Sequence, residues 1–197
     1  LYARLGLDTG TTTRILTLSM LTNWLGYLVV AGAVFTLRPP QLPPAWAVGT
    51  SGLRVLGVGM LCAAALYLAL CAGGRVQVLR LRGHELPVPG AGMVGVQLLL
   101  SCTNWAVMGS VLWVLMQGRV PYVAVLAVLL VAAVAGAITH VPAGLGVLEA
   151  VFVALLSHRL PAPTVLAALV GYRALFYLLP LCVAAAVFLR MAARIKR

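Results

Sequence analysis

The chain has 197 residues, of which 63% are hydrophobic and 9% charged, and its 14 Lys and Arg against 3 Asp and Glu give a formal net charge of +11. Because a soluble domain carries about 25% charged residues, this composition excludes an ordinary water-soluble fold. It also argues against a nucleic-acid partner, since the arginines lie within or beside apolar runs and not on a separate basic face. Membrane topology and contact with anionic lipid headgroups account for the positive charge.

Apolar runs of about 20 residues, the length that crosses a bilayer as a helix, recur along the chain. We therefore expect an all-α fold, a polytopic transmembrane helical bundle that forms a single domain over residues 1–197. In chain order the predicted segments are Ile15–Leu37, Ala45–Cys71, Val94–Met116, Tyr122–Thr139, Val141–Leu156 and Thr164–Leu189. The fifth is short, is broken by Pro and Gly at its start, and is compatible with a crossing or with a re-entrant hairpin.

The loops between these segments differ in positive charge, which predicts their side of the membrane. Six crossings, one for each predicted segment, would place both ends and the polar stretch Gly73–Pro89 on one side. That side collects Arg4, Arg14, Arg75, Arg80, Arg82, Arg190, Arg194, Lys196 and Arg197, whereas the other side has Arg38, Arg119 and Arg159. Because Lys and Arg are enriched in cytoplasmic loops, we expect a bacterial inner (plasma) membrane protein with both ends of this chain cytoplasmic.

Three charged side chains fall inside predicted spans, where ionisable groups are costly and commonly functional. Counted from the outer ends of their segments, Arg54 and Arg173 lie roughly 15 Å deep and Glu149 roughly 12 Å deep. Two interpretations stay open. Glu149 and Arg173 could form a pair that locks two helices while Arg54 reaches toward the interface. Alternatively, all three could form a substrate-translocation site for an anionic or zwitterionic headgroup.

A stretch rich in Pro and Gly precedes Glu149 and predicts a broken helix. Pro142 lacks a backbone N–H, and Gly144 and Gly146 tolerate dihedral angles that other residues avoid. Irregular backbone at membrane depth survives when protein buries it or when it lines a water-filled cavity. A helix that restarts near Gly146 would direct its N-terminal partial positive charge into such a cavity, where an anionic group could dock. These three residues are the candidate hinge, with a plain kink as the alternative.

The other polar residues of the spans are expected to have supporting roles. Asn23 and Asn104 are more suited to joining helices by hydrogen bonds than to binding substrate, and His140 to ending a helix than to carrying protons. The three acids and three histidines show no paired carboxylates and no nucleophile–base spacing. The four cysteines form no CxxC motif or metal-ligand cluster, and no phosphate-binding loop is present. We therefore expect no catalytic residues, no metal, no cofactor and no enzymatic activity.

The most specific pattern is the run P-A-G-L-G-V-L-E-A at residues 142–150. It resembles the P-G-G-x-G-x-x-E-A signature of the lysylphosphatidylglycerol synthase transmembrane-region family, which includes the flippase domain of MprF proteins and the stand-alone YbhN-like inner-membrane proteins. Further agreement comes from L-Y-A-R-L-G-L at residues 1–7, N-W-L-G-Y at 23–27, S-C-T-N-W at 101–105, and G-Y-R at 171–173 with Pro180. The resemblance covers essentially the whole chain and is closest to the YbhN-like branch.

This resemblance implies movement of a phospholipid, or of an aminoacylated or lipid-linked compound, between membrane leaflets. It therefore implies a lipid translocase of the flippase type. It also implies that the chain is the C-terminal two thirds of a longer membrane protein, because the family has further N-terminal helices. The alternative is a non-transporting scaffold or regulator of a lipid-synthesis enzyme. The expected partners are membrane lipids with anionic headgroups, and a lipid-synthesis enzyme or a second copy of the chain are further candidates.

Overall fold

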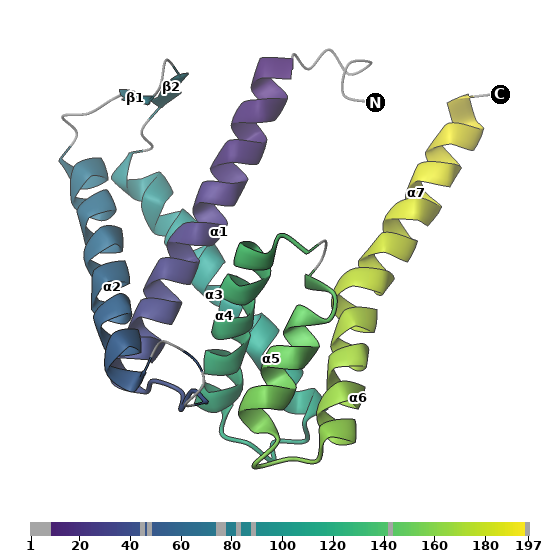
Figure 1. Cartoon of the computed structure of the whole chain (residues 1–197). Helices are drawn as coiled ribbons and strands as arrows, with labels where there is room; N and C mark the ends of the chain where they lie inside the picture. The colour runs from purple at the N-terminus through teal and green to yellow at the C-terminus, as the bar shows by residue number, and fades with distance from the viewer. Residues whose placement is uncertain are drawn as a thin grey trace. The chain divides into compact units, whose positions relative to one another are not determined.

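The computed structural model describes residues 9–43, 46, 49–73, 78–81, 84–87, 90–141 and 144–195. Within these residues the chain is helical apart from one two-stranded hairpin, so the predicted all-α helical bundle is confirmed (Figure 1). The chain divides into two compact units, Leu1–Val107 and Met108–Arg197. Each unit is described by itself.

The first unit is built on two long helices, α1 (Thr9–Leu37) and α2 (Thr50–Ala72), and on the first part of α3 (Ala91–Leu115). A buried cluster of Leu25, Ala64, Cys71 and Val94 joins these three helices. The backbones of α1 and α2 approach closely because small residues face each other. A Cβ atom added to Gly32 would lie 3.1 Å from the carbonyl oxygen of Gly57, which is the packing that small residues allow between membrane helices.

Two helix starts in this unit differ from the prediction. Helix α1 begins at Thr9 and not at Ile15, because the polar residues before the apolar run include no proline and can continue the helix. Helix α2 begins at Thr50 and not at Ala45, with Gly49 as an extended N-cap residue. The extended backbone of Gly49, with φ of −80° and ψ of 176°, places the first helical residue after it.

The polar stretch between α2 and α3, which the sequence predicts as a loop, contains an antiparallel hairpin of β1 (Val78–Leu81) and β2 (His84–Pro87). The register places Arg80 opposite Glu85.

The second unit contains the end of α3, then α4 (Tyr122–Thr139), α5 (Val147–Leu156) and α6 (Ala162–Arg173). A five-residue π-helical segment, η3 (Ala174–Leu178), follows α6 and leads into α7 (Leu179–Ile195). Helix α5 packs against both α4 and α6 (Figure 1). Buried side chains of these three helices form the core, among them Leu126, Leu130, Phe152, Leu155, Val165 and Leu169.

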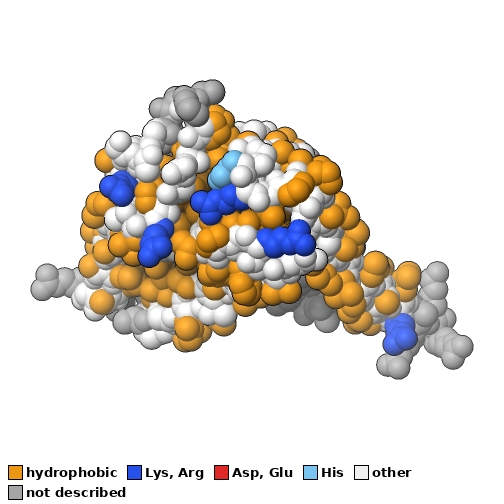
Figure 2. Space-filling model, turned by 90° about the horizontal axis from the view of Figure 1, so that it is seen from below, with side chains coloured by type: hydrophobic (Ala, Val, Ile, Leu, Met, Phe, Trp, Pro, Cys, Tyr) orange, Lys and Arg blue, Asp and Glu red, His pale blue; other side chains and the backbone are white. Residues whose placement is uncertain are grey.

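Five stretches of helix are long and apolar enough to cross a membrane: Thr17–Leu37, Thr50–Ala72, Gly92–Leu115, Tyr122–Thr139 and Ala162–Met191. Helix α5 is apolar but has only ten residues. Large hydrophobic side chains are exposed on these helices, for example Leu99, Ile138 and Leu189. Such exposed apolar side chains are suited to lipid and not to water. On the face seen from below in Figure 2, hydrophobic side chains lie among polar ones, and basic side chains appear at separate points.

Candidate functional site

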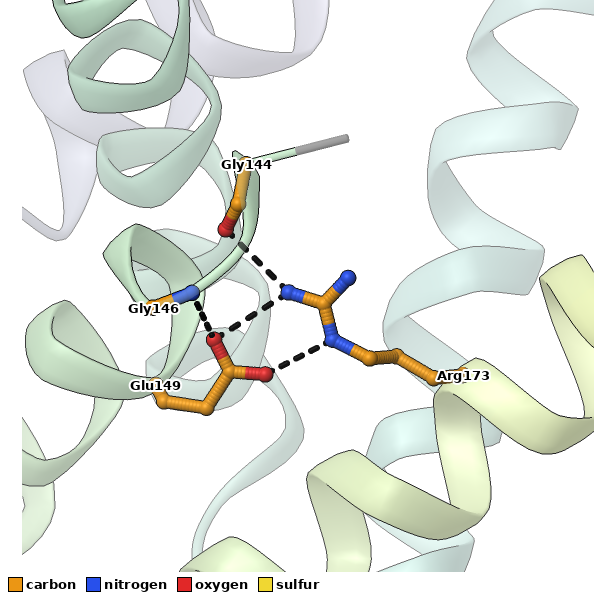
Figure 3. A network of polar contacts seen from close by, with 4 residues as sticks. All are labelled: Gly144, Gly146, Glu149 and Arg173. Carbon is orange, nitrogen blue, oxygen red and sulfur yellow. Dashed lines mark hydrogen bonds and ion pairs between the residues drawn. The ribbon is translucent and has the colours of Figure 1, made fainter. Parts of the chain in front are cut away.

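An ion pair joins the start of α5 to the end of α6 (Figure 3). The Arg173 Nε donates to Glu149 Oε1 at 2.7 Å, and Arg173 Nη2 donates to Glu149 Oε2 at 3.1 Å. Two parallel bonds between a guanidinium and a carboxylate form the strong, geometrically specific type of salt bridge. The exposed fractions of the Arg173 and Glu149 side chains are 16% and 23%. The pair is thus mostly buried but open on one side.

Both members of the pair also hold the irregular backbone between α4 and α5. Arg173 Nη2 donates to the carbonyl oxygen of Gly144 at 3.1 Å, and Glu149 Oε2 accepts the N–H of Gly146 at 2.9 Å. Glu149 is the third residue of α5 and Gly146 is its N-cap, so the carboxylate satisfies one of the N–H groups that a helix start leaves unpaired. Moving Arg173 away would therefore remove its bond to Gly144 and leave the bond from the Gly146 N–H to Glu149 in place.

The break itself depends on left-handed backbone. Gly144 and Gly146 have φ angles of 58° and 80°, which side chains rarely tolerate. His140 also has a positive φ, 54°, and is the C-cap residue of α4. Its Nδ1 lies 2.9 Å from the carbonyl oxygen of Ile138. His140 thus lies at a helix end, while Pro142, the other predicted hinge residue, lies outside the described residues.

The site lies in the interior of a helix of membrane length, Ala162–Met191. Arg173 is eleven residues after Ala162, or about 17 Å along the axis at the helical rise, compared with a hydrocarbon core of about 30 Å. The ten residues of α5 cover about 15 Å. Since Gly144 bonds to Arg173, the residues just before α5 lie at the level of Arg173.

A local change of helix type begins directly after Arg173. The N–H of Leu179 bonds to the carbonyl of Ala174, five residues earlier, as in a π-helix. Pro180 follows and has no N–H to donate, and its ring would crowd the carbonyl four residues before it in a regular α-helix. The wider π turn avoids this crowding, and π turns are frequent at functional sites. The aromatic rings of Tyr172 and Phe176 stack here with centroids 5.3 Å apart.

The third predicted charge, Arg54, belongs to the first unit. Because α2 starts at Thr50, Arg54 is the fifth residue of the helix, about 6 Å from its start, and its side chain is exposed. The expected depth of Arg54 in the membrane stays a prediction. A role for Arg54 in translocation stays a prediction.

The predicted supporting residues Asn23 and Asn104 lie on α1 and α3, with exposed side chains. The backbone carbonyl of Asn23 accepts from the Ser101 hydroxyl at 3.2 Å and from the Trp105 indole N–H at 3.4 Å. These bonds join α1 to α3, so the contact at this level uses the backbone of Asn23.

Three features of the sites were not found from the sequence: the Gly144 carbonyl as a partner of Arg173, the π segment, and the contacts of Ser101 and Trp105. Pro180 was the available signal for the π segment, since a proline inside an apolar span predicts some local distortion. Within the described part of the chain, no three His, Cys, Asp or Glu side chains gather as metal ligands.

Comparison with known proteins supports the same class. The chain is 44% identical over 198 residues to the inner membrane protein YbhN of Escherichia coli, an alignment that includes all of this chain and 62% of YbhN. It is 31% identical over 163 residues, or 82% of this chain, to the uncharacterized protein slr0712 of Synechocystis, of which it covers 50%. The chain thus spans between half and two thirds of these relatives.

No family model matches the chain, so its place in the wider lysylphosphatidylglycerol synthase transmembrane-region family stays a prediction. The similarity to YbhN extends over the whole chain and agrees with the long apolar helices. The chain is a YbhN-like, multi-pass integral inner-membrane protein.

Proposed function

We propose that this protein is a lipid translocase of the flippase type, in which Glu149 and Arg173 contact the lipid headgroup and the Gly144–Gly146 break lets the site open. Both ends of the chain are cytoplasmic in this proposal, and membrane lipids are the partners. The chain has no catalytic role. A lipid-synthesis enzyme, or a second copy of the chain, is a secondary partner.

The observation that carries the proposal is a two-point Glu–Arg pair in the interior of a helix of membrane length, tied by hydrogen bonds to broken backbone. A salt bridge that served only to hold two helices together would need no irregular backbone beside it. Buried ion pairs also contribute little net stability compared with apolar packing. Charged groups inside a membrane protein commonly mark the path of a polar substrate.

The partial exposure of the pair supports the same role. A headgroup has to reach the two side chains while its acyl chains stay in lipid, and both side chains are open to the outside of the described structure. The apolar surface of α6, η3 and α7 continues from the pair, with Leu175, Leu178 and Leu181 exposed. This surface is suited to acyl chains.

Lipid exchange in liposomes tests the proposal. The full-length protein is reconstituted with headgroup-labelled phospholipids, and a membrane-impermeant quencher then measures how fast the inner-leaflet lipid becomes accessible. Wild-type protein is expected to speed exchange above empty liposomes, and Glu149→Gln and Arg173→Gln to abolish the increase while staying folded. Arg119→Gln is the matched control, because Arg119 lies in the exposed turn before α4.

Two results would contradict the proposal. If wild-type protein matches empty liposomes for every phospholipid, the chain is better described as a non-transporting scaffold or regulator of a lipid-synthesis enzyme. If the two variants exchange lipid as fast as wild type, the ion pair is a helix lock and the transport path lies elsewhere.

A further inference from the structure

The charges at the break cancel. The three acids of the sequence are Asp8, Glu85 and Glu149, so Glu149 is the single acid of the unit Met108–Arg197. Its carboxylate is engaged by one guanidinium, that of Arg173. The closed site therefore carries one negative and one positive charge, held in contact.

While Glu149 and Arg173 are bonded to each other, which we call the closed state, most of their hydrogen-bonding atoms are engaged. Both oxygens of Glu149 accept bonds, and two nitrogens of Arg173 donate three bonds between them. A ligand that binds either side chain through the same atoms has to displace its partner. Whatever displaces the pair must also compensate both released charges, because a lone charge in a mostly buried site at membrane depth is strongly unfavourable.

We infer that the preferred headgroup is a zwitterion with one phosphate and one primary ammonium. The inference rests on the proposed function and adds the chemical class of the cargo. The phosphate takes the place of Glu149 on the guanidinium, and the ammonium takes the place of Arg173 on the carboxylate. The swap leaves every charge paired.

The geometry provides a receptor for each half of such a headgroup. Nε and Nη2 of Arg173 form a planar fork, which fits two oxygens of a phosphate as well as those of a carboxylate. On the other side, release of Arg173 frees two acceptors, the Glu149 carboxylate and the Gly144 carbonyl, that were within 3.1 Å of the same Nη2 atom. A primary ammonium can donate hydrogen bonds to both.

Other headgroups satisfy only part of the site. An anionic phosphatidylglycerol headgroup supplies the phosphate but leaves Glu149 without a cation. A choline headgroup supplies both charges, but its quaternary ammonium has no N–H to donate to Glu149 and Gly144. The site therefore ranks phosphatidylethanolamine first, phosphatidylcholine second and phosphatidylglycerol last.

Two measurements on the full-length protein test this ranking. The first is exchange in liposomes with labelled phosphatidylethanolamine, phosphatidylcholine and phosphatidylglycerol. The second is thermal stabilisation of the detergent-solubilised protein by the same three lipids, which needs no transport. In the first, phosphatidylethanolamine is expected to exchange about tenfold faster than phosphatidylglycerol. In the second, its apparent affinity is expected to be about tenfold higher, which is about 1.4 kcal/mol.

Glu149→Gln gives the sharpest readout because it removes the negative charge and leaves Arg173 in place. The variant is expected to lose the preference for phosphatidylethanolamine and to bind phosphatidylglycerol more tightly than wild type does. Arg173→Lys keeps the charge balance and should keep the wild-type ranking with weaker binding. This second variant preserves the test if Glu149→Gln does not fold. Arg119→Gln should leave the ranking unchanged.

The outcomes separate the inference from the proposed function. Equal stabilisation by phosphatidylethanolamine and phosphatidylglycerol, or a wild-type ranking retained by Glu149→Gln, overturns the zwitterion inference even if lipid exchange occurs. Selective stabilisation that disappears in Glu149→Gln, without exchange of any lipid, supports the headgroup site and contradicts the translocase.

Discussion

Gly26 of α1 packs directly against Ser101 of α3: a Cβ atom at position 26 would overlap the serine side chain and lie 2.8 Å from the Ser101 carbonyl carbon. The hydroxyl of Ser101 bonds to the backbone of Asn23, one turn earlier on α1. The ring of Tyr27 contacts Trp105 edge to face with centroids 5.2 Å apart. The contact between these two helices thus depends on the absence of a side chain at one position.

Gly26→Ala is therefore expected to destabilise the first unit by about 1–3 kcal/mol, the usual range for overpacking a close contact. The measurement is thermal unfolding in detergent. Gly59→Ala is the control, because a Cβ at position 59 of α2 has nothing within 4 Å and alanine favours helix over glycine. Equal melting temperatures for the two variants would show that α1 and α3 do not approach this closely.

Because Glu149 and Arg173 form an ion pair, the stability losses of their single mutations are expected to be strongly non-additive. Glu149→Ala leaves Arg173 without its carboxylate, and Arg173→Ala leaves Glu149 without its guanidinium, so each single change should cost about 2 kcal/mol. The double variant has no stranded charge and should cost clearly less than the sum. Unfolding of all four proteins in one detergent measures the coupling, and additive losses would mean that the pair is not formed in the folded protein.

The break predicts a purely conformational effect at Gly146. The added Cβ of Gly146→Ala would have nothing within 4 Å, but φ is 80° there, so a destabilisation of about 1 kcal/mol or more would come from backbone strain alone. Gly92→Ala on α3 is the matched control, since its Cβ also meets nothing and its φ is not positive. If Gly146→Ala is as stable as Gly92→Ala, the backbone at the start of α5 is not left-handed in the membrane.

Pro180 is expected to maintain the π segment. Pro180→Ala restores an N–H donor and removes the ring, so η3 should revert toward a regular α-helix and rotate α7 relative to α6. Spin labels at Leu166 and Val187, both exposed, would report the change as a shifted distance distribution by pulsed electron paramagnetic resonance. An unchanged distribution would mean that the proline does not cause the π turn.

Much of the fold could be predicted because apolar runs of membrane length define helices directly. The contact between Glu149 and Arg173 was also foreseeable, since helical rise places them at similar depths in neighbouring segments. Other features depend on backbone geometry that composition does not encode. The start of α2 follows the extended Gly49, and Gly144 contributes a carbonyl that has no side-chain signature.

Helix α5, with ten residues, has about half the length that a membrane crossing needs. This affects how the membrane topology of the chain can be determined. If α4 and α5 each cross, the chain crosses six times; if they form a hairpin that enters and leaves by the same face, it crosses four times. Both numbers are even, so reporter fusions at the two ends give the same answer in either case. A cysteine introduced at His140 separates the two topologies. If α4 crosses the membrane, His140 lies at the opposite membrane face from Tyr122, and the cysteine should react with small and bulky thiol reagents alike. If α4 and α5 turn inside the membrane, the cysteine should react with a small reagent and resist a bulky one.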